Sequence, residues 1–241
     1  GAARGVGAEV VRHLADLDYE ILLNYNRSEQ SARDLLDEVS SKTTAHLFKA
    51  DISKPLEVKA LFDFCRAQFG QLDVLVNNAS YSSTVGWEVS PENLDWNEWQ
   101  KTIDVDLKGT MLCSHEAYRL MKPQKSGKII NFSSSAALSG DVPTYLYTAA
   151  KAAIVGVTRT LARAFAPEVQ VNCIAPGSIA TDWIEKWKLT THDLEVIVNG
   201  TPLRRIGTPQ EVAALVAFLA SPECTFMTGQ TLVIDGGILL P

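Results

Sequence analysis

The sequence predicts an α/β fold of three layers, in which a doubly wound parallel sheet lies between two layers of helices. Short apolar segments typical of buried strands recur along the chain, at residues 20–25, 44–50, 72–79, 128–134, 169–176 and 230–237. The segments between them carry apolar residues at every third or fourth position, which is the spacing of amphipathic helices. This alternation favours parallel strands joined by helical crossovers, and the near-continuous apolar strands favour a sheet covered on both faces.

Length and composition favour one domain, residues 1–241, with a substantial core, since 46% of the 241 residues are hydrophobic. The formal net charge of −6 argues against nucleic acid or an anionic membrane as the main partner. No run of 18 uninterrupted apolar residues occurs, so we expect no membrane-spanning helix. The four cysteines are scattered and lack metal-site spacing. We interpret them as reduced cysteines of a cytoplasmic protein that holds no metal.

One segment is less regular than the rest. Residues 182–207 lie between two strand-like segments and are too many for a simple loop. We interpret them as a helical flap over a substrate site.

A glycine-rich turn, "GAARGVG", opens the chain and leads into an amphipathic helix. In such a turn, backbone N–H groups and the start of the helix can face the pyrophosphate of a dinucleotide. A dinucleotide fold also has a strand immediately before this turn. We therefore expect roughly ten further residues upstream of Gly1 in the natural protein, enough for one strand and a short lead-in.

The end of the next strand bears on the choice of cofactor. An NAD site usually has an acidic residue there, which binds the ribose 2′-hydroxyl. No Asp or Glu occurs from Ile21 to Ser28, whereas Arg27 is present and Arg4 lies in the glycine turn. Two guanidinium groups converging on one pocket suit a 2′-phosphate, so we predict NADP rather than NAD. The alternative is that both arginines are solvated surface charges.

A tyrosine and a lysine share one face of a predicted helix in "YLYTAAK". Tyr147 and Lys151 are four residues apart, and are therefore neighbours on a helix. An ammonium group beside a phenol stabilises the phenolate, which suits acid–base catalysis near neutral pH. Tyr145 points about 200° away around the helix. Taken alone, a pair at this spacing is also compatible with a purely structural role.

The motifs, taken in order, resemble those of the short-chain dehydrogenase/reductase family over nearly the whole chain. The glycine turn resembles the end of the TGxxxGxG motif, and "NNAS" (77–80) resembles NNAG with Ser80 in place of glycine. "YTAAK" (147–151) matches YxxxK, and "APGSIAT" (175–181) resembles the family's PG motif. "DIS" (51–53), "RIGTPQEVA" (205–213) and "TGQTLVIDGG" (228–237) also fit. The resemblance implies a Rossmann-type fold and hydride transfer to or from a nicotinamide.

The resemblance also implies roles for individual residues. Tyr147 would exchange a proton with the substrate oxygen, Lys151 would bond the nicotinamide ribose, and Ser134 would bind the substrate oxygen, with Ser133 and Ser135 as competitors. Asp51 and Ile52 would flank the adenine. The implied cofactor-binding residues are Gly1, Arg4, Gly5, Val6, Gly7, Asn26, Arg27, Ser28, Asp51, Ile52, Asn78, Ala79, Tyr147, Lys151, Pro176, Gly177, Ile179 and Thr181.

One catalytic position departs from the family pattern. Where the family has an asparagine that is thought to hold a proton-relaying water, this chain has Asp106. A carboxylate accepts hydrogen bonds but donates none, and it would favour the charged form of Lys151. We expect the relay to survive and Asp106→Asn to leave activity within about tenfold. The alternative is that Asp106 only bonds local backbone.

The substrate is less constrained. The chain most resembles 3-oxoacyl-(acyl-carrier-protein) reductases, with pteridine reductases and sugar or steroid dehydrogenases of the same family as alternatives. Lys122, Lys125 and Lys128 could dock an acidic carrier, but Glu168 weakens that interpretation. The aromatic residues Tyr81, Trp87, Tyr145, Trp183 and Trp187 indicate an apolar or ring-bearing substrate, or else structural packing.

Two further expectations concern assembly and activity. The resemblance implies a homotetramer or homodimer, packed through predicted helices at 97–121 and 146–166. A different class of function stays open, namely a nucleotide-binding sensor that has lost turnover.

Overall fold

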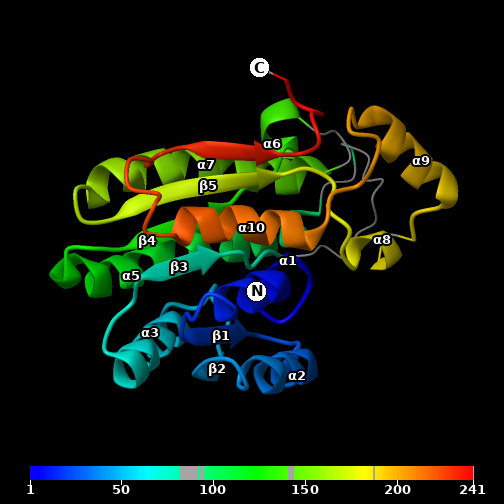
Figure 1. Cartoon of the computed structure of the whole chain (residues 1–241). Helices are drawn as coiled ribbons and strands as arrows, with labels where there is room; N and C mark the ends of the chain where they lie inside the picture. The colour runs from blue at the N-terminus through cyan, green and yellow to red at the C-terminus, as the bar shows by residue number, and fades with distance from the viewer. Residues whose placement is uncertain (82–91, 93–94, 141–143, 187, 241) are drawn as a thin grey trace.

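The computed structural model describes residues 1–81, 92, 95–140, 144–186 and 188–240, and Figure 1 shows a parallel α/β arrangement of them. Each predicted strand is confirmed, with ends that shift by up to three residues. The strands are β1 (Ile21–Tyr25), β2 (Ala45–Lys49), β3 (Val74–Asn77), β4 (Lys128–Phe132), β5 (Gln170–Pro176) and β6 (Thr231–Ile234). β1 pairs with β2, and the other four pair in the order β3-β4-β5-β6, every pair parallel.

Helices cover both faces of the strands, as the alternating pattern predicts. On one face α1 (Gly5–Ala15), α2 (Glu29–Val39) and α10 (Pro209–Ala220) bury a first core with β1 and β5. On the other, α3 (Pro55–Phe69), α5 (Thr110–Gln124) and α7 (Tyr145–Phe165) bury a second. Figure 1 shows α1 and α10 on the near side of the strands and α5 and α7 behind them.

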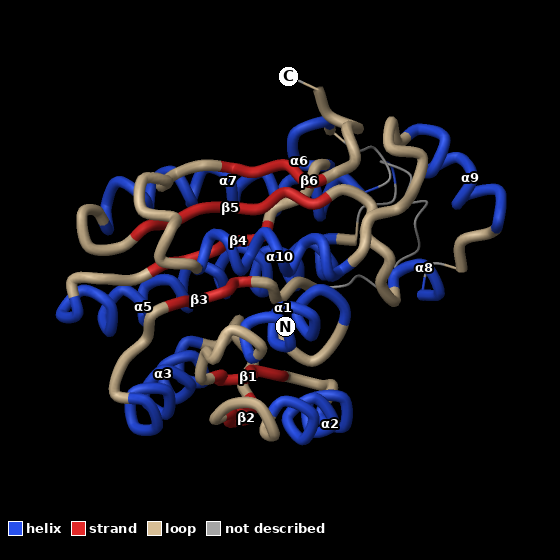
Figure 2. The backbone as a smooth tube through the Cα atoms, viewed as in Figure 1, coloured by secondary structure: helices blue, strands red, loops and turns tan. Residues whose placement is uncertain are grey.

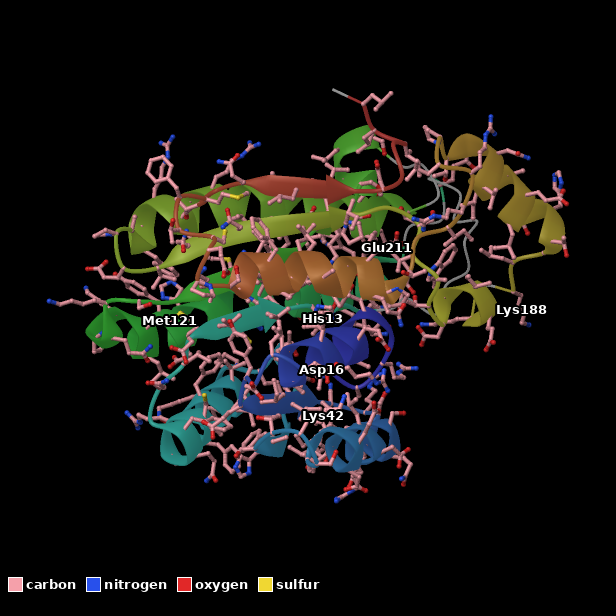
Figure 3. The ribbon with its side chains drawn as sticks, viewed as in Figure 1. His13, Asp16, Lys42, Met121, Lys188 and Glu211 are labelled. Atoms are coloured by element: carbon pink, nitrogen blue, oxygen red, sulfur yellow. The ribbon has the colours of Figure 1, made fainter. Side chains whose placement is uncertain are left out.

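Local sequence signals fix several helix ends. Thr208 and Glu211 form a capping box at the start of α10, and Pro209 occupies its first turn, where a missing N–H costs nothing. α3 starts at Pro55 and is followed by Gly70, whose φ of 74° is left-handed. In Figure 3, Asp16 beyond the end of α1 lies near Lys42 beyond α2, and their side chains form an ion pair of 2.6 Å.

The helix predicted at 97–121 is in fact three successive pieces. They are α4 (Trp96–Thr102), a π-helix η2 (Ile103–Gly109) and α5. A π-helical stretch is uncommon and frequently occurs at functional sites. Nothing in the residue pattern predicts it, because each piece alone has ordinary helical spacing.

The predicted flap contains two helices, α8 (Trp183–Lys186) and α9 (Thr191–Gly200), which Figure 2 shows set apart from the strands. A parallel bridge between Ile179 and Gly207 brings the two ends of the segment together. A Cβ at Gly207 would lie 2.7 Å from the Cδ1 of Ile179, so a larger residue there would have to displace the Ile179 side chain.

A cavity of about 770 Å³ is lined by residues of both sheets, whose strands β1 and β3 lie apart from one another in Figure 2. Ile21, Leu22 and Asn24 of β1 line it, as do residues 74–77 of β3. Gly1 and Ala2 lie at one end, where their backbone nitrogens donate to the carbonyl of Asn24. The expectation of a further strand upstream of Gly1 stays a prediction.

Two properties of the described residues are also relevant to function. None of the helices there has the length and apolar character needed to cross a membrane. In the same part of the chain, no group of three or more His, Cys, Asp or Glu side chains is arranged to hold a metal ion.

Candidate active site

Two hydrogen bonds fasten the end of β4 to the first turns of α7. The Lys151 Nζ donates to the carbonyl of Phe132 at 3.1 Å, and the buried Ser133 Oγ donates to the carbonyl of Lys151 at 2.8 Å. Ser134 follows directly and is half-buried, with its Oγ accepting from the backbone of Ala136 at 3.2 Å. Ser133 therefore has a structural bond that sequence reasoning missed, while Ser134 stays at the strand end beside α7.

Tyr147 and Lys151 share one face of α7, as their spacing predicts. The Lys151 Nζ lies 5.5 Å from the centroid of the Tyr147 ring. Lys151 is buried and Tyr147 is half-buried. The side chain of Tyr145, like residues 87 and 187 of the predicted aromatic cluster, lies outside the described residues.

Asp106 reaches Lys151 from the middle of the π-helix η2. The Lys151 Nζ and the Asp106 Oδ2 are 3.1 Å apart, and their side chains are 4% and 0% exposed. Burial alone would lower the pKa of Lys151, but the Asp106 carboxylate and Tyr147 more than offset it, so the pKa of Lys151 is raised. Asp106 and Lys151 thus lie close together, as expected, and Lys151 is held as an ammonium group.

The glycine turn and the "NNAS" segment pack against one another without room for side chains. Asn78 Nδ2 donates to the carbonyl of Gly1 at 2.8 Å. A Cβ at Gly1 would lie 2.5 Å from the backbone nitrogen of Ala79, and one at Gly7 would lie 2.0 Å from the carbonyl oxygen of Gly1. Gly5 has a φ of 53°. The turn therefore leaves bare backbone at the start of α1, which is the cradle that a pyrophosphate requires.

The PG motif borders the same turn from β5. Pro176 ends β5, and a Cβ at Gly177 would lie 2.6 Å from the Cβ of Asp235. Ile179 is buried, and the Thr181 methyl lies 3.2 Å from where a Cβ at Gly5 would be. The structure thus brings Thr181 to the glycine turn, from which it is 176 residues distant in the sequence.

The adenine end of the predicted site lies beyond β1 and β2. Asn26 and Arg27 are exposed just after β1, and Ser28 is the N-cap residue of α2. Burial raises the pKa of Asp51, but hydrogen bonds from Ser53, the charge of Lys54 and a hydrogen bond from Asn26 together outweigh it, and the pKa is lowered overall. Asp51 is therefore held ionised.

Of the residues predicted near the adenine end, Ile52 packs as expected, whereas Arg4 does not. Ile52 lies against η2, where a Cβ at Gly109 would be 2.8 Å from its side chain. The predicted convergence of two arginines is different in the structure. Arg4 forms an ion pair with Asp182 at the start of the flap, with Nη1 and Oδ2 2.8 Å apart. Sequence reasoning missed this pair because its partners are 178 residues apart.

A buried polar network supports the strand ends beneath the site. Asn77 Nδ2 donates to Ser114 Oγ at 3.0 Å and to Asn131 Oδ1 at 2.9 Å. Asn131 Nδ2 in turn donates to Thr158 Oγ1 at 3.0 Å. These bonds join β3, β4, α5 and α7, and so fix where the two strands end.

Comparison with known proteins gives the same family throughout. The family model described as "Enoyl-(Acyl carrier protein) reductase" matches residues 1–239. A solved short-chain dehydrogenase/reductase of Brucella melitensis superposes with a TM-score of 0.89 at 26% identity, covering 100% of this chain and 95% of the other. The chain belongs to the short-chain dehydrogenase/reductase family.

Other members of the short-chain dehydrogenase/reductase family are also similar to it. A 3-oxoacyl-(acyl-carrier-protein) reductase of Synechocystis is 36% identical over 243 residues, which are 100% of this chain and 95% of the relative. The solved structure of YwfH, an NADPH-dependent reductase involved in bacilysin biosynthesis, has a TM-score of 0.89 at 28% identity and covers 99% and 96% of the two chains. The family assignment confirms the resemblance in the motifs.

Proposed function

We propose that this protein is an NADP(H)-dependent oxidoreductase that transfers a hydride between nicotinamide and a carbonyl or secondary alcohol substrate. Family membership supports the reaction class. The observation that carries the proposal is the joining of β4 to α7 through Lys151, which keeps Ser134 and Tyr147 on neighbouring elements. Tyr147 and Lys151 share one helix face there, with a Nζ-to-ring distance of 5.5 Å.

Each catalytic side chain has a proposed task. A bound nicotinamide supplies or accepts the hydride. Tyr147 donates a proton to the substrate oxygen in reduction and takes one from the alcohol in oxidation, with Lys151 stabilising the phenolate. The Ser134 hydroxyl donates a hydrogen bond to the same oxygen, on which negative charge develops. Asp106 holds the charge of Lys151, 3.1 Å away.

The cofactor is proposed to lie along the carboxyl ends of the strands. The turn of Gly1, Gly5, Val6 and Gly7 faces its pyrophosphate with backbone N–H groups. Glycine keeps this backbone accessible, and a Cβ at Gly7 would have no room beside Gly1. Other groups follow the family pattern. Asp51 and Ile52 flank the adenine, Asn78 and Ala79 line the cleft, Lys151 bonds the nicotinamide ribose, and Pro176, Gly177, Ile179 and Thr181 surround the carboxamide.

NADP is proposed rather than NAD. Residues 21–28 hold no carboxylate, and Asn26, Arg27 and Ser28 follow β1 where a 2′-phosphate would lie. Arg4 can join them only by leaving Asp182, or by bonding both groups at once. The similar solved reductase YwfH is described as NADPH-dependent, which supports the same choice.

A 3-oxoacyl thioester is the proposed substrate class. The relative in Synechocystis is a 3-oxoacyl-(acyl-carrier-protein) reductase, and the hydroxyl groups of Ser134 and Tyr147, carried at the end of β4 and on α7, are of the kind that binds a carbonyl oxygen. Carrier docking through the predicted lysines is weaker than expected, because Lys128 donates to the backbone carbonyls of Ser221 and Cys224. Lys122 and Lys125 stay available for this role. Pteridine, sugar and steroid substrates are the alternatives.

We also propose a homotetramer, or a homodimer, that packs through α4, α5 and α7. Trp96 at the start of α4 is 68% exposed, and Met111 of α5 is exposed as well, so these helices offer apolar surface to a second copy. All four cysteines are free and buried, which supports a reducing, cytoplasmic location.

A screen of carbonyl substrates tests the proposal. NADPH and NADH are offered in parallel with 3-oxoacyl thioesters, pterins, sugars and steroids, and oxidation is followed by loss of nicotinamide absorbance. We expect oxidation of NADPH by a 3-oxoacyl thioester. We expect Tyr147→Phe to lower kcat by about 10²–10⁴-fold with NADPH affinity nearly unchanged. Tight NADPH binding without oxidation by any substrate would favour the sensor instead.

A further inference from the structure

The two positions at which the motifs depart from the family pattern are bonded to each other. Ser80 stands where NNAG has its glycine, and Asp106 stands at the usual asparagine. Although they are 26 residues apart, the Ser80 Oγ donates to the Asp106 Oδ2 at 2.5 Å. That length is typical of a hydroxyl bonded to an ionised carboxylate.

Each oxygen of Asp106 faces one group that can only donate. Oδ1 accepts from the backbone N–H of Tyr81 at 2.6 Å, and Oδ2 lies 3.1 Å from the Lys151 Nζ. An asparagine in this place would turn its NH₂ group toward one of those two donors, whichever way the amide is flipped. The expectation from sequence that Asp106→Asn is tolerated within about tenfold is therefore revised, and we expect a larger loss of activity.

The ammonium group of Lys151 also has most of its hydrogen-bond donors in use. It has three N–H donors, of which the contacts to Asp106 and to the carbonyl of Phe132 use two. The third is left for the cofactor or for the Tyr147 phenol. The direction of that third N–H thus depends on the position of the Asp106 carboxylate.

We propose that Ser80 is a positioning residue, whose hydroxyl holds the Asp106 carboxylate against Lys151 and so keeps Lys151 protonated and correctly aimed. The proposal rests on the function proposed above, in which Lys151 serves Tyr147 and the cofactor. Ser80 itself is exposed, whereas Asp106 and Lys151 are buried, so Ser80 connects the buried pair with the surface of the site.

Other titratable groups also lie around Lys151 and Asp106. Tyr147 of α7 and Cys173 of β5 face Lys151 and raise its pKa in the same direction as Asp106, against the effect of burial. On the other side, Glu98 and Lys101 of α4 meet at Tyr81, whose hydroxyl donates to Glu98 at 3.1 Å. Among these groups, Asp106 is the one that forms an ion pair with Lys151 and that Ser80 contacts.

The charge of Lys151 can be followed without turnover. The protein is labelled with ¹³C at lysine Cε, the Lys151 resonance is assigned with Lys151→Arg, and its shift is recorded from pH 7 to 11.5. In the native protein we expect Lys151 to stay protonated at pH 10. In Asp106→Asn it should lose its proton below the ordinary lysine value of about 10.4. In Ser80→Ala the midpoint of the Lys151 titration should fall by about 1 pH unit.

Matched variants separate positioning from a general disturbance. Ser80→Thr keeps the hydroxyl and should titrate like the native protein, and Ser40→Ala, which removes an exposed hydroxyl at the C-cap of α2, serves as a distant control. Kinetics with NADPH should follow the same order, with the alkaline limb of kcat moved to lower pH in Ser80→Ala but not in Ser80→Thr.

Two outcomes overturn the inference: a Lys151 titration in Ser80→Ala that equals the native one, or a Ser80→Thr variant that behaves like Ser80→Ala. A different result would contradict the proposed function alone. If native protein oxidises no NADPH with any carbonyl while Lys151 titrates as expected, Ser80 still positions Asp106 but not for this reaction.

Discussion

The Nζ of Lys151 lies 3.1 Å from the Oδ2 of Asp106, and both side chains are almost completely buried. A buried ion pair brings little net stability compared with apolar residues, but removing one partner leaves the other charge uncompensated. The same lysine also bonds the end of β4. Folding, and catalysis in the function proposed above, therefore depend on one ammonium group, and its removal should have effects that can be measured separately on each.

Lys151→Met should lower the free energy of unfolding by about 3–5 kcal/mol, because Asp106 is left as a buried, uncompensated carboxylate. Urea denaturation followed by circular dichroism measures it. Lys59→Met is the control, since Lys59 pairs with Asp63 at an exposed site and should change the unfolding midpoint little. Equal midpoints for the two variants would contradict the idea that the buried pair matters.

The contribution of Lys151 to stability should depend on pH in one direction. Its pKa is raised in the folded protein, so the stabilisation is fully present below the ordinary lysine pKa of about 10.4 and is lost as pH rises through the folded value. The difference in unfolding free energy between native protein and Lys151→Met should thus be constant from about pH 7 to 9. A difference that grows with pH would reverse the assigned direction.

Ser133→Ala and Ser134→Ala should separate stability from catalysis. Ser133 is buried and bonds the carbonyl of Lys151, so its loss should lower the free energy of unfolding by about 1 kcal/mol. Ser134→Ala should lower kcat by about 10²-fold with unfolding nearly unchanged, because it removes a donor to the substrate oxygen. Thermal unfolding and steady-state kinetics on both variants provide the comparison, and reversed effects would exchange the two roles.

Arg27→Ala should weaken NADPH binding by about 10- to 100-fold while leaving NADH binding unchanged, because a charge-assisted bond to the 2′-phosphate is lost. Fluorescence titration with each nucleotide measures both dissociation constants. Arg33→Ala is a suitable control, since Arg33 pairs with Glu29 on the surface of α2. An equal loss for NADPH and NADH would mean that Arg27 does not recognise the phosphate.

Much of the fold could be predicted because its signals are local. Each strand is an apolar run, and the capping box of Thr208 and Glu211 lies within four residues. The pairing of Tyr147 with Lys151 follows from helix geometry. The bonds of Ser80 to Asp106 and of Arg4 to Asp182 could not be predicted, because they depend on where elements far apart in the chain meet.

The same reason explains what the sequence suggested incorrectly. Lys128 looks like a free surface charge in the sequence, but it begins β4 beside the loop after α10 and donates to two carbonyls there. Burial accordingly lowers the pKa of Lys128. A charge on a strand end can be assigned to surface or interior only once its neighbouring elements are placed.

The wide turns of η2 have a consequence for the neighbouring helices. η2 joins α4 to α5 without a break, and each residue turns a helix by about 100°. The buried side chains of Thr102, Asp106 and Thr110 therefore keep their inward direction only while the number of residues between them is unchanged. Deleting or inserting a single residue between positions 103 and 109 would therefore be felt along all of α5, as well as at the carboxylate that η2 carries.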